Sequence, residues 1–441
     1  MTGASTINKK ATRMYDILNL PDTQFPKDFL WGSATAGHQV EGDNINSQWW
    51  HWEQQPEWTR GNPDRAPSGK ACDHWERYRD DVELLASLGH QAYRFSIEWS
   101  RIEPEQGRWH EPSLARYLDL LERLKGKGIR AFVTLHHFTH PQWFELLGGF
   151  NKAENVARFE RFVAWVVPRI APLVDGWCVI NEFNLPQDAD AGMRKLNFLR
   201  AHARGYHIIK QHSAAPVSSA HAFVHWFPRR WNDPLDKTLT AYVDWVTHEF
   251  FLHAVRTGEF VYPGMDAVSD PEFKDTCDYW AVNYYTRHMI DARCARKQGA
   301  RFRHAELKMI PQDFYLEEMF PEGLISWMER LSDRPIYITE NGCACDDDAF
   351  RIAYLALHFC ALREAMDRGA DVRGYFYWSL LDNYEWGSFV PRFGLVDVDR
   401  ATFARTPKPS AHFYREIIRA GGMSRALVNQ YLKRVPTLRA R

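Results

Sequence analysis

Two glutamates, Glu182 and Glu340, stand where two predicted buried strands end. Glu340 follows the β-branched and aromatic run 335–339, and the Asn-Gly pair after it permits a sharp turn. Glu182 follows a second strand, predicted over residues 176–180. A pair of carboxylates facing each other across a sugar-sized gap is the arrangement that glycoside hydrolysis requires. The sequence therefore predicts an acid and a nucleophile or base at these two positions.

The two carboxylates need different surroundings to take different roles. An acid needs a pKa raised by burial or by a neighbouring carboxylate, whereas a nucleophile must stay ionised. A nearby arginine such as Arg94 and a phenol such as Tyr285 would keep Glu340 ionised. We therefore expect Glu340 to be the nucleophile and Glu182 the acid/base.

The elements that position these residues are eight predicted strands, each followed by a helix. The strands are predicted over residues 29–34, 91–97, 129–135, 176–180, 216–223, 278–284, 336–339 and 372–378, and the helices over 74–88, 112–126, 156–170, 193–212, 235–256, 320–330, 350–368 and 409–418. Parallel neighbours need crossover connections, so this alternation predicts a parallel sheet.

Eight such units predict a single α/β domain over residues 1–441, a (β/α)8 TIM barrel with an N-terminal extension to about residue 24 and a C-terminal tail from about residue 420. An open doubly wound sheet is the alternative. No glycine-rich nucleotide-binding turn follows any of the strands, which disfavours that sheet.

A barrel brings the carboxyl ends of all its strands to one mouth. Six or more of the predicted strand ends carry polar or aromatic groups, which a purely structural scaffold would not need. These groups are Gln39, Arg94, Glu98, His136, His137, Asn181, Glu182, Asn283, Tyr285, Glu340, Trp378, Glu385 and Trp386. Their convergence predicts an active site at that mouth.

Composition narrows the class of protein. The 55 Lys and Arg residues nearly balance 56 Asp and Glu residues, so no basic field for nucleic acid is expected. No apolar secretory segment or membrane-length apolar run is present, which predicts a cytoplasmic protein. The seven scattered cysteines are expected to be reduced thiols. Aromatic residues make up 14% of the chain, and the tryptophan-rich run 48–53 suits a wall that stacks on sugar rings.

The chain resembles glycoside hydrolase family 1, the retaining β-glucosidase and β-galactosidase family. The resemblance extends over the whole chain and is carried by the segments 29–32, 39–42, 93–97, 181–182, 283–285, 338–342 and 378–386. It implies that Glu340 is the nucleophile and Glu182 the acid/base, in agreement with the roles expected from the residues themselves. No metal and no cofactor are implied.

The resemblance also implies how a substrate is held. The non-reducing sugar would be bound through its hydroxyls by Gln39, His137, Asn181, Glu385 and Trp386, with Trp378 stacked beneath it; Arg94, Asn283 and Tyr285 would surround the nucleophile, and the 378–379 peptide bond would be cis. The expected partner is a small-molecule β-glycoside or oligosaccharide.

Some positions depart from the family pattern. Phe183 replaces a proline after the acid, which removes a rigid turn, and Phe138 replaces a tryptophan, which removes an indole N–H donor. The loop 387–393 lacks the pattern of phospho-glycosidases, and Glu385 would repel a 6-phosphate, so phosphorylated sugars are not expected. The segment 287–334 is expected to contribute to the entrance for the aglycone.

Several alternatives stay open at this point. His136, His137 and His140 suggest a metal site, but adjacent strand residues point to opposite faces. The segment 343–348, with two cysteines and three aspartates, suggests a cation site or, more simply, a solvated loop leading into a helix. Glu98 could pair with Arg94 purely structurally. A sugar-binding barrel without catalysis and a transglycosidase are the alternative functions.

Overall fold

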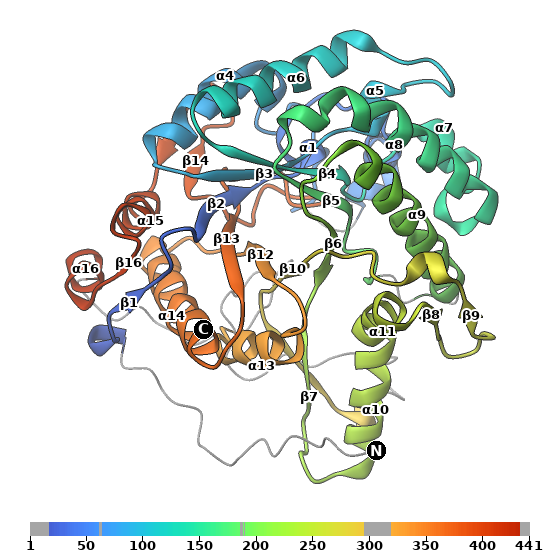
Figure 1. The fold of residues 1–441 in the computed structure, drawn as a ribbon. Helices are drawn as coiled ribbons and strands as arrows, with labels where there is room; N and C mark the ends of the chain where they lie inside the picture. The colour runs from blue at the N-terminus through green and yellow to red at the C-terminus, as the bar shows by residue number, and fades with distance from the viewer. Residues whose placement is uncertain (1–16, 61–63, 186–187, 189, 295–318, 433–441) are drawn as a thin grey trace.

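The computed structural model describes residues 17–60, 64–185, 188, 190–294 and 319–432. Its centre is a closed barrel of parallel strands in the order β2-β3-β4-β5-β6-β10-β12-β13, with β13 pairing back to β2 (Figure 1). The strands are β2 (Leu30–Ala34), β3 (Ala92–Ser96), β4 (Arg130–His136), β5 (Gly176–Asn181), β6 (Val217–Ala222), β10 (Trp280–Asn283), β12 (Ile336–Asn341) and β13 (Val372–Trp378). The predicted (β/α)8 barrel is confirmed, and no strand end differs from its predicted position by more than two residues.

The long helices surround this barrel (Figure 1). They are α4 (His74–Ser87), α6 (Glu111–Gly126), α8 (Val156–Ile170), α9 (Ala191–His212), α10 (Pro234–Asp244), α11 (Phe250–Thr257), α13 (Glu322–Arg330), α14 (Asp348–Asp367) and α15 (Pro409–Ala420). In α8 the buried positions Phe159, Phe162, Val163 and Val166 recur at the three-and-four spacing that turns one apolar face toward the strands.

Shorter elements lie mainly in the connections. They include α1 (Gly37–Val40), α2 (Gln48–Glu53), α3 (Pro56–Thr59), α5 (Trp99–Ile102), α7 (Gln142–Leu146) and α16 (Arg425–Tyr431). Strand β7 (His225–Pro228) pairs in parallel with β11 (Arg287–Ile290) outside the barrel, a pairing that the sequence did not predict. Strand β7 and helix α10 extend away from the barrel in Figure 1.

The helix predicted over 235–256 is interrupted. Between α10 and α11 the chain forms a π-helical turn over Trp245–Glu249. The carbonyl of Val246 accepts a hydrogen bond of 2.6 Å from Lys195 Nζ, so a side chain of α9 supplies a partner from outside the helix. Lys195 is fully buried, and burial lowers the pKa of its amino group to about 7.

Aromatic side chains fill the barrel interior. The Phe132 ring lies 4.9 Å from the Phe376 ring and 5.4 Å from the Tyr337 ring. A Cβ at Gly176 would stand 2.3 Å from Phe132 Cε1, so glycine makes room for this ring. The interior is therefore a packed core, and a substrate can enter only beyond it, at the strand ends.

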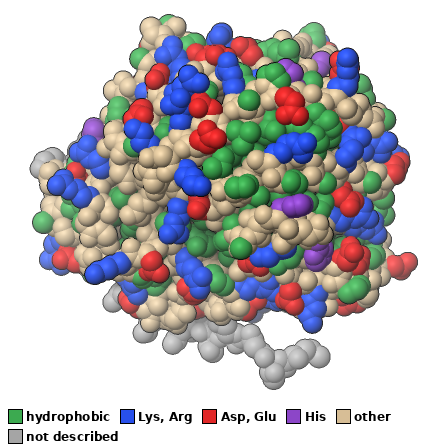
Figure 2. All heavy atoms as spheres, turned by 45° about the horizontal axis from the view of Figure 1, so that its top comes forward, with side chains coloured by type: hydrophobic (Ala, Val, Ile, Leu, Met, Phe, Trp, Pro, Cys, Tyr) green, Lys and Arg blue, Asp and Glu red, His purple; other side chains and the backbone are tan. Residues whose placement is uncertain are grey.

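The two ends of the described chain meet. Strand β1 (Thr23–Gln24) pairs with β16 (Gly422–Met423), and Ile17 and Leu20 are buried. Residues 17–24 and 420–432 thus pack together against helix α14 on the outside of the barrel. Each described helix is too short or too polar to cross a bilayer. Figure 2 shows Lys/Arg and Asp/Glu side chains interspersed over the face in view.

Candidate active site

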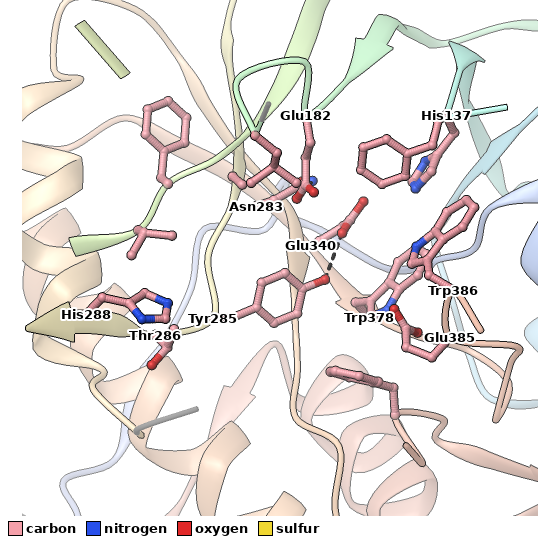
Figure 3. A pocket seen from close by; sticks show the side chains of 16 residues that line it. His137, Glu182, Asn283, Tyr285, Thr286, His288, Glu340, Trp378, Glu385 and Trp386 are labelled. Carbon is pink, nitrogen blue, oxygen red and sulfur yellow. Dashed lines mark hydrogen bonds between the residues drawn. The ribbon is translucent and has the colours of Figure 1, made fainter. Parts of the chain in front are cut away.

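A cavity of about 260 Å³ lies at the carboxyl ends of the barrel strands (Figure 3). Among the predicted site residues, those that line it are His137, Glu182, Asn283, Tyr285, Glu340, Trp378, Glu385 and Trp386. Gln39, Arg94 and Asn181 are buried behind these and hydrogen-bond to them. The structure therefore brings these predicted residues together, whereas Glu98 and His136, also predicted at the mouth, do not line the cavity.

Glu340 is held by a cation and a phenol. It lies near the end of β12, where Arg94 of β3 places its NH1 group 2.5 Å from Oε1. Tyr285 donates its hydroxyl to Oε2 at 2.7 Å (Figure 3). Burial raises the pKa of Glu340, while the charge of Arg94 and the hydrogen bond from Tyr285 oppose that rise. Of the two central carboxylates, Glu340 is the one that ionises first, because it alone has a guanidinium partner.

Glu182 occupies a position suited to holding a proton. It follows β5 directly, with a left-handed backbone φ of 49°, and its N–H donates to the Ala220 carbonyl at 2.7 Å. Asn283 Nδ2 donates to Oε1 at 2.8 Å. Burial raises the pKa of Glu182 to about 8, and the negative charge of Glu340 contributes to the rise. Glu182 is thus protonated at neutral pH, while Arg94 and Tyr285 favour the charged form of Glu340.

A hydrogen-bonded frame connects the two carboxylates. Arg94 NH2 donates to Asn181 Oδ1 at 2.7 Å, and Asn283 Nδ2 donates to the same oxygen at 3.1 Å. Asn283 also contacts Glu182, so a continuous path runs from Glu340 through Arg94, Asn181 and Asn283 to Glu182. The positions of both carboxylates are fixed by side chains from other strands of the barrel, which are not their hydrogen-bonded neighbours.

The opposite side of the cavity carries donors and acceptors beside flat rings. Asn181 Nδ2 lies 3.2 Å from His137 Nε2, and since Asn181 Oδ1 is occupied by two donors, the amide donates and the His137 proton sits on Nδ1. Burial and the charge of Arg94 hold the pKa of His137 well below its usual value, so the ring is neutral. It stacks against Trp378 at 5.8 Å.

Two buried polar atoms on this side lack a partner among the described residues. They are His137 Nδ1, a donor, and Gln39 Oε1, an acceptor. Gln39 Nε2 is already used, donating to Glu385 Oε2 at 3.1 Å. Unpaired buried polar atoms are costly in a folded protein. A ligand with hydroxyl groups would satisfy both of them.

The two phenylalanines that depart from the family pattern, Phe183 and Phe138, both pack against neighbouring aromatic rings. The Phe183 ring is buried and lies 4.7 Å from the His221 ring and 5.4 Å from the Phe251 ring, so packing holds the turn after Glu182 where a proline is absent. Phe138, with φ of 64°, places its ring 5.0 Å from Trp386.

Three expectations are corrected and one is confirmed. Arg94 pairs with Glu340 and not with Glu98; Glu98 accepts hydrogen bonds from the His38 backbone and the Asn44 and Thr139 side chains. The loop start at 343–345 is buried rather than solvated, because it packs in one apolar cluster with Trp378 and Phe393. Asp347 does cap α14, accepting from Ala349 N. Trp49 belongs to the run 48–53 that was expected to stack on sugar rings. It contacts the Trp386 ring at 4.8 Å instead and lies a layer behind the cavity. As expected for adjacent strand residues, His136 and His137 point to opposite faces: His136 contacts Phe150 outside the barrel, while His137 faces the cavity.

Part of the cavity lining was not predicted. It consists of Leu185, Ala222, Phe223, Val224, Thr286, His288 and Phe393. Five of these seven side chains are apolar, and Ala222, Phe223 and Val224 lie at or just after the end of β6, where they look like core residues in the sequence. The expected contribution of segment 287–334 is seen in His288, and residues 295–318 of that segment lie outside the described residues.

The comparisons with known proteins agree with this geometry. The family model described as glycosyl hydrolase family 1 matches residues 21–423. The chain is 33% identical to thermostable beta-glucosidase B of Thermobispora bispora, over 91% of this chain and 92% of that protein. It is 29% identical to the beta-galactosidase of Sulfolobus acidocaldarius, over 94% and 99% of the two chains.

Solved structures show the same fold. The beta-glycosidase from Pyrococcus horikoshii superposes with a TM-score of 0.85 and 34% sequence identity, covering 95% of this chain and 100% of that one. The similarity therefore includes the whole barrel and the strand ends that carry the cavity.

Proposed function

The chain belongs to glycosyl hydrolase family 1 and is an O-glycosyl hydrolase, and from this premise we propose that it removes the non-reducing terminal β-D-glucosyl, galactosyl or fucosyl residue of a small β-glycoside by double displacement, with Glu340 as nucleophile and Glu182 as acid/base. The observation that carries the assignment is the contrast between the two carboxylates. Glu340 has Arg94 at 2.5 Å, and Glu182 has a pKa raised to about 8.

In the first step, ionised Glu340 attacks the anomeric carbon. The bond from that carbon to the aglycone oxygen breaks while Glu182 gives its proton to the departing oxygen. The products are the free aglycone and a glycosyl ester of Glu340. Tyr285, which donates to Glu340 Oε2 at 2.7 Å, holds the attacking carboxylate in one orientation.

In the second step, Glu182 acts as a base. Ester formation removes the negative charge of Glu340, which is one cause of the raised pKa of Glu182. The pKa of Glu182 therefore falls once the intermediate forms, and the carboxylate takes a proton from the water that attacks the anomeric carbon. The ester bond breaks, and the sugar leaves with its original configuration.

We propose that the sugar lies over Trp378, with its hydroxyls bound by Gln39, His137, Asn181, Glu385 and Trp386, and with Asn283 beside the reacting carbon. The unpaired Gln39 Oε1 and His137 Nδ1 support this placement, since they supply an acceptor and a donor. Glu385, which borders the cavity, would repel a phosphate group, so unphosphorylated sugars are the expected substrates.

A non-catalytic sugar-binding barrel would have no use for two buried carboxylates with opposed electrostatic surroundings, and both are present here. Transfer of the glycosyl group to an alcohol uses the same intermediate. It is distinguished from hydrolysis by measuring the products with and without an alcohol acceptor.

The test of the nucleophile is chemical rescue. Glu340→Ala should abolish turnover of an aryl β-glycoside, and added azide should restore part of it and give the glycosyl azide of inverted configuration. Glu57→Ala, at a side chain 66% exposed, is the matched control and should keep full activity without azide. Absence of any glycosyl azide would show that Glu340 is not the nucleophile.

The test of the acid depends on the leaving group. Glu182→Ala should lower kcat/KM far more for an alkyl glycoside, whose departing oxygen needs a proton, than for a dinitrophenyl glycoside, whose oxygen does not. Equal losses on the two substrates would contradict the assignment.

A further inference from the structure

The cavity has two chemically different sides. Figure 3 shows His137, Trp378, Glu385 and Trp386 together on one side, with His288 and Thr286 on the other. Phe223 and Val224 belong to the second side, since they directly precede His225, whose N–H donates to the Thr286 carbonyl; Leu185 lines the cavity beside Glu182. In the described lining, Asp, Glu, Lys and Arg are represented only by Glu182, Glu340 and Glu385. Leu185, Phe223 and Val224, called here the apolar wall, carry no charge and no polar side-chain atom.

The apolar wall is attached to the residues around the acid. Leu185 N donates to the Glu182 carbonyl at 3.2 Å, so the two residues belong to one turn. Phe223 N donates to the carbonyl of Asn283 at 2.8 Å, and the Asn283 side chain contacts Glu182. Because Glu182 protonates the departing oxygen, the group bonded to that oxygen lies beside this turn and within reach of the wall.

Within the apolar wall, Phe223 is buried and tightly packed, whereas Leu185 is exposed. Phe223 is 2% exposed, with its ring 4.7 Å from Trp327 and 5.5 Å from His248 of the π-helical turn. Leu185 is 44% exposed at the mouth of the cavity. A ligand that covers Leu185 and Val224 would remove apolar surface from water, which is favourable in proportion to the area covered.

We infer that the aglycone of the natural substrate is an apolar alkyl or aryl group and not a second sugar, with Leu185, Phe223 and Val224 as the residues that determine this preference. The inference rests on the proposed function. Leu185, Phe223 and Val224 offer no hydrogen bond to the hydroxyl groups of a second sugar, and each hydroxyl that loses its water against them would weaken binding. An alkyl chain or aromatic ring loses nothing there.

The experiment compares leaving groups on one sugar. Methyl, butyl, hexyl and octyl β-glycosides, the matching disaccharide and the β-glycosyl fluoride are assayed with the intact protein. The fluoride has no aglycone to reach the wall and reports the reaction at the sugar alone. We expect kcat/KM, divided by that of the fluoride, to rise about twofold to fourfold for each added methylene up to hexyl, and the disaccharide to lie below the hexyl glycoside.

A surface variant tests the residues. Leu185→Ser should lower the hexyl-to-fluoride ratio of kcat/KM by about threefold to tenfold. Leu235→Ser removes an equally apolar side chain, 68% exposed on α10, and should leave the ratio unchanged. Thermal unfolding checks that both variants are folded.

The outcomes distinguish an error in the proposed function from an error in the aglycone preference. If the fluoride is not hydrolysed, the proposed function is wrong and this inference falls with it. If the fluoride is hydrolysed but the ratio does not change with chain length, or the disaccharide is preferred to the hexyl glycoside, the inference alone is overturned. An equal effect of Leu185→Ser and Leu235→Ser would also overturn it.

Discussion

Replacing Glu182 by glutamine should stabilise the protein by an amount that grows with pH. The folded protein holds a proton on Glu182 up to a pKa of about 8, while an ordinary glutamate releases it near 4.5. Between these values the folded state binds a proton that the unfolded chain has lost, so the native protein becomes less stable as the pH rises. Glutamine cannot ionise, and it keeps the oxygen that accepts from Asn283.

The size of the effect follows from the interval between the two pKa values. From 4.5 to about 8 is about 3.5 pH units, and at about 1.4 kcal/mol per unit the full gain is about 5 kcal/mol. At pH 6.5, about two units above 4.5, it is about 3 kcal/mol, and below pH 4.5 it vanishes. An unfolding entropy of about 2 cal/mol/K per residue makes 1 kcal/mol worth about 1 °C for a chain of this length.

The assay is thermal unfolding of both proteins at one scan rate, at several pH values from 4 to 9. The unfolding midpoint of Glu182→Gln should equal that of the native protein at pH 4, exceed it by about 3 °C at pH 6.5 and by about 5 °C above pH 8. Glu57→Gln, at an exposed side chain, controls for the general effect of replacing a carboxylate by an amide. A difference that stays constant across this range would refute the claim that Glu182 carries a proton at neutral pH.

Two further substitutions test the surroundings of the carboxylates. Tyr285→Phe removes the 2.7 Å hydrogen bond to Glu340, which should lower kcat/KM about tenfold to a hundredfold and move the acid limb of the pH–rate profile to higher pH, because that bond lowers the pKa of Glu340; an unmoved limb would contradict this. Gly342→Ala would place a Cβ 1.8 Å from the Trp378 carbonyl oxygen, so we expect about 3 kcal/mol or more of lost stability by chemical denaturation. Gly126→Ala, with nothing near its Cβ, should not destabilise the protein, and equal losses at both glycines would rule out the steric explanation.

The barrel could be predicted because its information is local. Each strand and helix has its own apolar period, and the order of elements alone selects a parallel sheet. The contact between Arg94 and Glu340, 246 positions apart, was also predictable, because a barrel brings all strand ends to one mouth. The pattern does not determine which residue each strand-end group pairs with. Glu98 is an example, since its partners come from loops and not from Arg94.

Features that depend on contacts between residues far apart in the sequence could not be predicted. Phe183 looks like a defect where a proline is expected, and only its burial against His221 and Phe251 shows how the turn is held. The π-helical turn depends on a hydrogen bond from Lys195, 51 positions from its acceptor. Phe223 carries no polar atom in its side chain, so nothing in the sequence distinguishes a cavity wall from core.

The frame that joins Arg94, Asn181 and Asn283 has a consequence for the energetics of the reaction. These side chains lose their rotational freedom when the chain folds, before any glycoside binds. Their loss of conformational entropy is therefore a cost of folding and not of substrate binding. The catalytic side chains are therefore already in position when a glycoside enters the cavity. Weakening the frame at Arg94, which is not placed on the sugar, should therefore slow turnover without greatly changing the affinity for the ground-state substrate.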